Sequence, residues 1–236
     1  MNKLISCVIS CYNEEKNLPI LLDQIISNKL NDKFQFIIVN NGSNDNSSLV
    51  IKELENKYKD IKFVNVKEDF GWGNGIMTGL KHAECELVGW THGDLQYDLK
   101  ELNNVYKIIQ ENDKKYNTIL VKGLRKKRKL IENIFSKGMS VVASLILLKT
   151  FTDINSQPNF FSRDIYESFA NPPTDLMLDL YLYNKVKKID NHLIVRFPVI
   201  QHERKFGISS WRKNFLSNFE LSLKQFIGIL KIRFTK

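Results

Sequence analysis

Short apolar runs alternate with stretches of helical spacing over the first hundred residues. Four runs rich in branched or aromatic apolar side chains have the composition of buried strands. Between them, apolar side chains recur every three or four residues, as on one face of a helix. This alternation predicts an α/β domain with a mostly parallel sheet and right-handed crossovers. The strands are expected at residues 8–10, 34–39, 61–66 and 86–90, and the helices at 18–26 and 50–58, with a short one ending at 83.

Beyond residue 98 the pattern is less regular but still mixes helices with strands. The longest helix is expected over residues 131–148, where Lys137 and Gly138 break its apolar run. The chain shows no internal repeat and no linker-like segment before residue 210. We therefore expect one domain over residues 1–210. The other elements expected here are helices at 99–112 and 176–186 and strands at 118–123 and 193–199.

Composition narrows the class of protein. With 43% apolar and 26% charged residues, the 236-residue chain is globular rather than disordered. Its net charge of +9 favours anionic partners, but no nucleic-acid-reading module is recognisable, so we expect no nucleic acid. Three cysteines without a C-x-x-C pair indicate a reduced, cytoplasmic compartment. The first fifteen residues read as a strand rather than a signal peptide, and no apolar run is long enough to span a membrane.

The segment THGDLQYD, residues 91–98, carries the most informative chemistry. It follows a predicted buried strand, so it should lie at the carboxyl edge of the sheet, where open α/β folds bind ligands. Asp94 and Gln96 offer oxygen ligands, and His92 offers a nitrogen. This set suits a divalent cation, Mg²⁺ or Mn²⁺, that is shared with a diphosphate. An acidic turn of this kind also caps helices, so the motif alone leaves both readings open.

Several segments together resemble the family 2 glycosyltransferases. The segments CVISCYNEEKNL and IIVNNGSNDNS, a glycine-rich loop before a short helix, and GDLQ after a strand occur in that family's order. The segments DINSQPNFFSRDIY and FPVIQHERKFGISSW resemble the polyprenol-phosphate mannosyl- and glucosyltransferase branch. The resemblance implies the GT-A fold. It also implies a metal-dependent transfer of a sugar from a nucleoside-diphosphate donor, linked to UDP or GDP, with inversion.

The resemblance also assigns roles in holding the nucleotide. Tyr12, Asn13 and Glu14 match the segment that holds the base and ribose. Asn40 and Asn41 stand where the family usually has an aspartate that accepts the N–H of the base. An amide oxygen can accept the same hydrogen bond without the assistance of charge. An asparagine-rich turn that caps a helix is the alternative for this pair.

Other matches concern the phosphates, the metal and the reaction. Gly73 lies in a glycine loop whose backbone N–H groups could approach a phosphate. Arg125 and Arg204 match phosphate-binding arginines. His92 replaces the first aspartate of the usual Asp-x-Asp, which leaves Asp94 as the main metal ligand and catalytic carboxylate, with Gln96 as a second ligand.

A general base is needed only where the acceptor is a hydroxyl group. Asp153, Asp175 and Asp179 are the candidates to accept that proton, and Asp153 ranks first because it matches an aspartate of the resembling branch. Asp179 reads equally well as the polar face of a helix. A polyprenyl phosphate acceptor is already an anion and requires no base.

The C-terminal segment predicts contact with a membrane surface. We expect residues 211–236 to form an amphipathic helix that has an apolar face and several basic residues. Such a helix lies in the interface, where lysine and arginine meet anionic headgroups. We therefore expect a peripheral location on the inner face of the membrane and a polyprenyl phosphate or lipid-linked glycan as acceptor, in cell-surface polysaccharide or glycolipid synthesis. Packing on the domain or on a second subunit is the alternative for this helix.

Two other functions remain open at this stage. The missing first aspartate is compatible with a nucleotide-sugar-binding protein of weakened catalysis. A sugar nucleotidyltransferase would share the sheet and the metal, but it usually carries a basic, glycine-rich loop after the first strand. Here YNEEKNL, residues 12–18, stands in that place.

Overall fold

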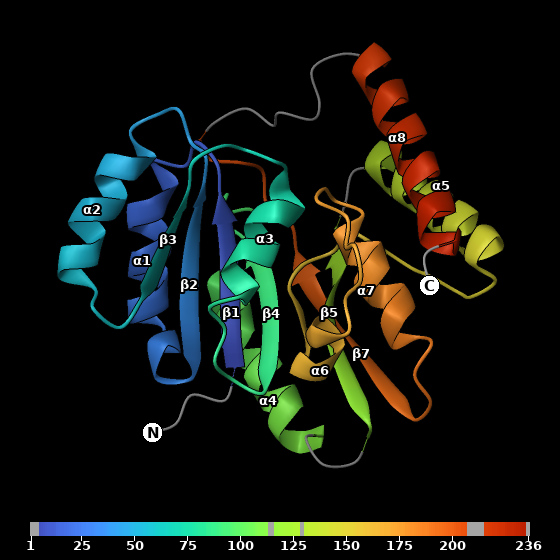
Figure 1. Cartoon of the computed structure of the whole chain (residues 1–236), viewed down its shortest axis with the longest axis horizontal. Coiled ribbons are helices and arrows are strands. Elements are labelled where there is room, and N and C mark those ends of the chain that lie inside the picture. The colour runs from blue at the N-terminus through green and yellow to red at the C-terminus, as the bar shows by residue number, and fades with distance from the viewer. Residues whose placement is uncertain (1–4, 113–115, 128–129, 207–214, 235–236) are drawn as a thin grey trace.

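The computed structural model describes residues 5–112, 116–127, 130–206 and 215–234 (Figure 1). A seven-stranded sheet in the order β3-β2-β1-β4-β6-β5-β7 forms the centre of the molecule. Six strands run in the same direction, and only β6 is antiparallel to its neighbours. The strands are β1 Ile5–Cys11, β2 Phe34–Asn41, β3 Lys62–Val66, β4 Leu87–His92, β5 Thr118–Lys126, β6 Asn159–Ser162 and β7 His192–Ile200.

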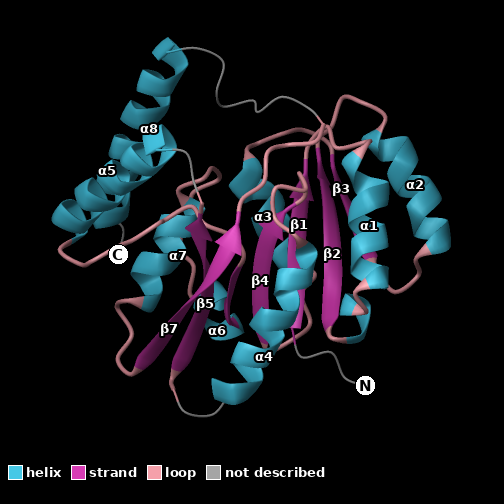
Figure 2. Ribbon diagram, turned by 180° about the vertical axis from the view of Figure 1, so that it is seen from behind, coloured by secondary structure: helices cyan, strands magenta, loops and turns pink. Residues whose placement is uncertain are grey.

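Helices cover both faces of this sheet. In Figure 1 α3, α6 and α7 lie in front, whereas Figure 2 shows α1 and α4 on the opposite face. The α-helices are α1 Asn17–Ser27, α2 Ser47–Lys57, α3 Trp72–Leu80, α4 Leu102–Asn112, α5 Leu130–Leu147, α6 Arg163–Glu167, α7 Leu178–Val186 and α8 Phe215–Phe234. Two short 3-10 turns, Leu30–Asp32 and Leu99–Glu101, complete the described elements.

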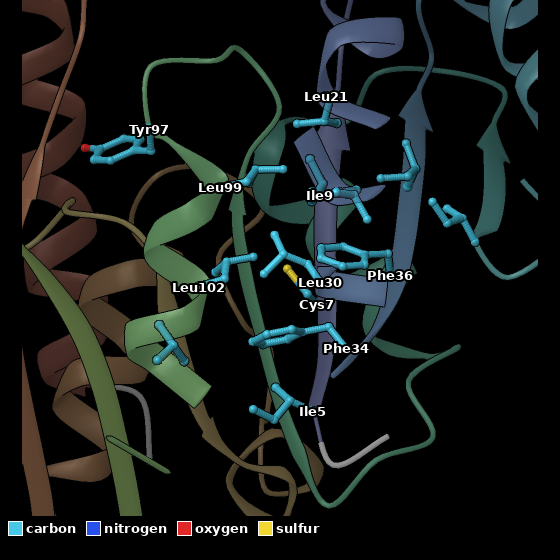
Figure 3. Close-up of a cluster of buried hydrophobic side chains, with 14 of the residues drawn as sticks. Ile5, Cys7, Ile9, Leu21, Leu30, Phe34, Phe36, Tyr97, Leu99 and Leu102 are labelled. Atoms are coloured by element: carbon cyan, nitrogen blue, oxygen red, sulfur yellow. The ribbon is translucent and has the colours of Figure 1, made fainter. Parts of the chain in front are cut away.

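Each face of the sheet has its own apolar core. On the face of α1 and α4, Phe34, Phe36 and Leu102 pack in a buried cluster (Figure 3). On the other face, Trp90 is fully buried among side chains of α3 and α7. Both cores arise because the central strands are apolar on both sides, which is the pattern of a parallel sheet covered by helices.

The register of the strands aligns their carboxyl ends. Cys11 pairs with Asn40, Asn41 pairs with Val66, and Ser10 pairs with His92. The polar loops after β1, β2, β3 and β4 therefore emerge at one edge of the sheet. Ligands of open α/β sheets bind at this edge.

Helices α5 and α8 lie side by side at the border of the molecule (Figures 1 and 2). The inner face of α8 buries Ile229 and Ile232, and Gly228 lies against Met177. Within the described residues, no helix combines the length and apolar character needed to cross a membrane.

The mostly parallel α/β sheet expected from the sequence is confirmed, with several differences in detail. Strand β6 and helix α6 were not expected, because the pattern between residues 149 and 175 is irregular. Helix α5 is continuous through Lys137 and Gly138, since both positions face solvent and interrupt no packing. The expected helix at 99–112 divides into a 3-10 turn and α4. The expected boundary between residues 210 and 211 lies outside the described residues.

Candidate functional site

The loops after β1 and β2 are joined by hydrogen bonds at the carboxyl edge. Asn13 adopts a left-handed backbone conformation, and its Oδ1 accepts the backbone N–H of Asn44 at 2.9 Å. The backbone N–H groups of Asn13 and Glu14 donate to the hydroxyls of Ser43 and Ser47, each at 3.0 Å. Next to this junction, the Tyr12 ring is 37% exposed. An exposed aromatic face on a fixed turn is a suitable platform for a nucleotide base.

The amides of Asn40 and Asn41 are turned inward. Asn40 Oδ1 accepts the backbone N–H of Ser43 at 3.3 Å, and its Nδ2 donates to Ser48 Oγ at 2.8 Å. Asn41 Nδ2 donates to Asp69 Oδ1 at 2.8 Å. Both residues are at most 3% exposed. Asn41 Oδ1 is buried and accepts no hydrogen bond from the described residues, so the expected role of these amides in binding a base stays a prediction.

Gly73 is a packing position rather than an open loop. It lies inside α3, and a Cβ added to it would lie 2.7 Å from the Pro173 carbonyl oxygen and 2.9 Å from that of Asp175. Because the segment at 173–175 already occupies this space, a side chain at position 73 would collide with it. Glycine at position 73 thus allows the close approach of α3 to this segment, and the phosphate role expected for its backbone N–H stays a prediction.

Asp94 is the central carboxylate of the edge, and an arginine holds it. It is 5% exposed, and its Oδ2 accepts hydrogen bonds from Arg204 Nη2 at 3.0 Å and Nε at 3.1 Å. Arg204 Nη2 also lies 3.6 Å from Glu14 Oε1. Burial raises the pKa of Glu14 to about 7, opposed by its hydrogen bond from Asn17 and by the charge of Arg204. The loops after β1, β4 and β7 thus meet at one guanidinium group.

Gln96 and His92 flank Asp94 with different surroundings. Gln96 Nε2 donates to the His202 carbonyl at 3.1 Å, and the backbone N–H of His202 donates to the Gln96 carbonyl at 2.8 Å. The His92 ring lies 5.2 Å from the Trp72 ring and 6.0 Å from the Tyr97 ring, centroid to centroid. His92 therefore sits between aromatic rings, whereas Gln96 is fixed beside Asp94 by backbone contacts.

This donor set fits a cation that is shared with a ligand. No group of three or more histidine, cysteine, aspartate or glutamate side chains suited to a metal occurs in the described ranges. A small hard cation such as Mg²⁺ is usually held by one or two carboxylates together with substrate phosphates, not by an all-protein cage. The Asp94 carboxylate with the Gln96 amide oxygen meets that requirement.

Asp153 and Arg125 form a second charged cluster. Arg125 Nε and backbone N–H donate to the Asp153 carboxylate at 2.7 and 2.8 Å, and Arg125 Nη2 completes the pair. Ser136 of α5 lies 3.3 Å from Arg125 Nη2, and Arg196 lies 4.0 Å from Asp153 Oδ2. Burial raises the pKa of Asp153, but the hydrogen bonds and charge of Arg125 outweigh it and hold the pKa below its usual value. A carboxylate held in this way is a poor proton acceptor.

Asp179 lies deep in the fold. It is 1% exposed, and its oxygens accept hydrogen bonds from Trp90 Nε1, Gln157 Nε2 and Asn159 Nδ2 at 2.9, 2.9 and 3.0 Å. Burial raises its pKa, opposed by the nearby charge of Lys122. No acceptor can reach this carboxylate in the described structure, so its position supports the alternative of a structural role.

Sequence reasoning missed four residues of this edge, namely Asp69, Ser136, Arg196 and His202. Asp69 follows β3 just as Asp94 follows β4, so the same rule of a polar residue after a strand points to it. His202 follows β7 by two residues, so the same rule points to it as well. Ser136 and Arg196 have no comparable signal, because they lie within α5 and β7 and only long-range contacts join them to the charged cluster.

Comparisons with known proteins agree on one family. The model of the family described as Glycosyl transferase family 2 matches residues 6–168. A dolichyl-phosphate beta-glucosyltransferase of Trichomonas vaginalis is 26% identical over 175 residues, which are 68% of this chain and 54% of that protein. An undecaprenyl-phosphate 4-deoxy-4-formamido-L-arabinose transferase of Photorhabdus laumondii is 24% identical over 212 residues, 89% of this chain and 63% of that protein. The chain thus spans less than two thirds of either relative.

Solved structures show the same architecture. Glucosyl-3-phosphoglycerate synthase from Mycobacterium tuberculosis, in complex with Mn²⁺, UDP and glucosyl-3-phosphoglycerate, has a TM-score of 0.73 at 16% identity. That match covers 98% of this chain and 80% of the other. A mannosyltransferase from Pyrobaculum calidifontis, in complex with GDP-Man and Mn²⁺, has a TM-score of 0.63 at 19% identity and covers 98% and 69%. The GT-A architecture expected from the sequence is confirmed.

Proposed function

Because the chain belongs to glycosyl transferase family 2, we propose that it transfers a sugar, with inversion, from a UDP- or GDP-linked donor to a lipid-linked acceptor. The observation that carries the proposal is the meeting of Asp94, Glu14 and Arg204 at the carboxyl edge, beside the exposed ring of Tyr12. A buried carboxylate and a guanidinium group are the charges needed to hold a metal-bound diphosphate. The family also argues against the nucleotidyltransferase alternative.

Asp94 and Gln96 are the residues that would hold Mg²⁺ or Mn²⁺. A divalent ion bound there supplies charge neutralisation for the departing diphosphate. Asp94 Oδ2 now faces Arg204, so this arginine must turn from the carboxylate before Oδ2 can face a cation. In its new position, the guanidinium group can form paired hydrogen bonds with phosphate oxygens.

The acceptor we propose is a polyprenyl phosphate, with a lipid-linked glycan as the other possibility. The names of two relatives specify transfer to dolichyl phosphate and undecaprenyl phosphate. In this chain, Asp153 is paired with Arg125 and Asp179 is buried, so neither is free to remove a proton. An acceptor phosphate is already an anionic nucleophile and needs no base, which makes it consistent with this site.

We also propose peripheral attachment to the cytoplasmic face of a membrane. Helix α5 exposes Ile134, Val141 and Leu145 at steps of seven and four residues, here called the α5 stripe. Helix α8 exposes Leu223, Phe226, Ile227 and Phe234, together with Lys224, Lys231 and Arg233. Exposed apolar faces with nearby basic residues are typical of helices that lie in the interface of an anionic membrane.

A nucleotide-sugar-binding protein of weakened catalysis is the second candidate. It is favoured by His92, which replaces the first metal-binding aspartate of the family pattern and packs between Trp72 and Tyr97. Such a protein would bind the donor without turnover, so binding and transfer must be measured separately.

Asp94→Ala tests the assignment directly. Release of UDP or GDP from a panel of UDP- and GDP-sugars is measured with undecaprenyl phosphate in detergent and with Mg²⁺ or Mn²⁺. The variant is expected to lose at least about a hundredfold in activity, since the charge on the diphosphate is no longer balanced. Asp98→Asn, a carboxylate change in the same loop, is the control and should retain activity.

Two other outcomes are informative. Near-normal turnover by Asp94→Ala would show that the metal assignment is wrong. Donor binding by calorimetry, without any turnover by the unaltered chain, would favour the binding protein.

A further inference from the structure

The loops that should hold the base contain few carboxylates with a free oxygen. Asp45 is fully engaged, since its Oδ1 accepts the backbone N–H of Ser47 at 2.9 Å and its Oδ2 accepts that of Glu15 at 3.2 Å. Glu15 Oε2 accepts the backbone N–H of Asn46 at 3.1 Å. The amides of Asn40 and Asn41, as described above, are turned inward. Glu15 therefore keeps one oxygen, Oε1, without a hydrogen bond from the described residues, and Asp69 on the loop after β3 does the same with its Oδ2.

Asp69, three residues after β3, has the required geometry. Its Oδ1 accepts hydrogen bonds from Asn41 Nδ2 and from the backbone N–H of Gly71, both at 2.8 Å. The residue is exposed, and within the described part of the chain its Oδ2 takes part in no hydrogen bond or ion pair. One oxygen thus fixes the carboxylate, while the other faces outward.

The backbone around Asp69 is held against the end of β2. Gly42 has a φ of +72° and lies so close to residues 68 and 69 that a Cβ there would collide with their backbone. The Oδ1 atom of Asn41 lies next to Gly75, and Gly75 also lies against the side chain of Ser10 in β1. Asp69 is therefore held at the end of β2, the strand that pairs with β1, from which the loop of Tyr12 begins.

We propose that Asp69 is the specificity-determining residue that reads the nucleotide base. Its Oδ2 accepts the N3–H of uracil or the N1–H of guanine. Cytosine and adenine present an unprotonated ring nitrogen at the corresponding position, which repels a carboxylate. The strand-end amide Asn41 becomes a positioning residue that orients Asp69. The inference rests on the proposed function, because it assumes a nucleotide at this edge.

The test compares nucleotides whose bases have or lack a ring N–H group at the position that faces Asp69. Binding of UDP, GDP, CDP and ADP to the full chain is measured by calorimetry with Mn²⁺ present. Asp69→Asn should weaken binding of the preferred nucleotide, UDP or GDP, by about ten- to a hundredfold, since a charged hydrogen bond is lost. Binding of CDP and ADP should change by less than about twofold, so selectivity collapses. The matched control is Glu68→Gln, which removes the same charge one residue earlier and should leave selectivity intact.

The possible results distinguish a failure of the role proposed for Asp69 from a failure of the proposed function. Equal weakening of all four nucleotides by Asp69→Asn would show that Asp69 only shapes the loop, which overturns the inference. Unchanged selectivity in a variant that melts like the unaltered chain would overturn it as well. If the unaltered chain binds none of the four nucleotides, the proposed function itself fails.

Discussion

At the scale of single residues, burial and pairing decide what each carboxylate of the edge can do. Asp94 and Asp153 are both paired with arginine, but Asp94 lies beside Gln96 and Glu14, whereas Asp153 lies among further cations. At Glu14, burial outweighs the effect of its partners and raises its pKa to about 7. Its ionisation therefore falls within the range in which the protein would be assayed.

Glu14 predicts a pH dependence of stability. The folded protein binds this proton more tightly than the unfolded chain, whose glutamate has a pKa of 4.5. The free energy of unfolding should therefore fall as pH rises from about 4.5 to about 7, by on the order of 2 kcal/mol, and then level off. Glu14→Gln should remove this fall and melt higher than the unaltered chain at pH 8. Urea titrations from pH 4 to 8 in metal-free buffer measure it.

The neighbouring Glu15→Gln is the control for this prediction. It removes one carboxylate at the next position and should keep the decline between pH 4.5 and 7. A decline of the same size in Glu14→Gln would assign it to another group.

At the scale of elements, a buried polar network joins β4, β5, β6 and α7. Lys122 of β5 is fully buried and donates to the Ser156 carbonyl at 2.8 Å and to Asn159 Oδ1 at 2.6 Å. Asn159 in turn donates to Asp179, so the cation and the carboxylate belong to one network. Burial lowers the pKa of Lys122, and the charge of Asp179 opposes that shift. Each of the two charges therefore depends on the other.

This interdependence predicts non-additive mutational effects. Asp179→Asn should destabilise the protein by roughly 3–5 kcal/mol, because it leaves a buried cation without its counter-charge. Combining it with Lys122→Met should cost less than the sum of the two single changes, since neither charge then remains alone. Chemical denaturation of the four proteins gives the coupling energy. Additive effects would show that the two side chains act independently.

The strands and helices up to residue 112 could be predicted from sequence because their apolar periods are regular. Strand β6 could not be predicted in this way, because it has only four residues. Its strand conformation depends on hydrogen bonds to β4 and β5, which are distant from it in the sequence. Asp94 and Gln96 could be placed because they follow a strand. The inward turn of Asn40 and Asn41 could not, because it depends on Ser48 and Asp69, which the chain supplies from other elements.

At the scale of the whole molecule, the apolar surface of α5 and α8 is the main feature outside the site. Leu145 in the α5 stripe is 70% exposed and Phe234 of α8 is 81% exposed. Ser136, at the start of α5, contacts Arg125 in the second charged cluster. A membrane bound to this surface would therefore lie next to Arg125, near the edge where the proposed lipid-linked acceptor would react.

The α5 stripe predicts membrane binding that depends on apolar contact. Replacing Val141 and Leu145 with glutamine should reduce flotation with vesicles containing anionic lipid several-fold at low salt, without changing the net charge. Leu49→Gln on α2, at the far side of the sheet, is the control and should float normally, although Leu49 is 59% exposed. Failure of the unaltered chain to float would contradict membrane attachment.

The contact between Arg204 and Asp94 has a consequence for the order of binding. The free protein carries its own exchangeable counter-ion, so a metal ion arriving alone competes with a tethered guanidinium group for Asp94 Oδ2. The apparent affinity for the metal ion is the intrinsic affinity multiplied by the fraction of molecules in which Arg204 has turned away from Asp94. A metal that arrives with a diphosphate also brings the anion that Arg204 can bind in exchange. The site should therefore fill with both together, and cation and donor should each raise the affinity for the other by the same factor.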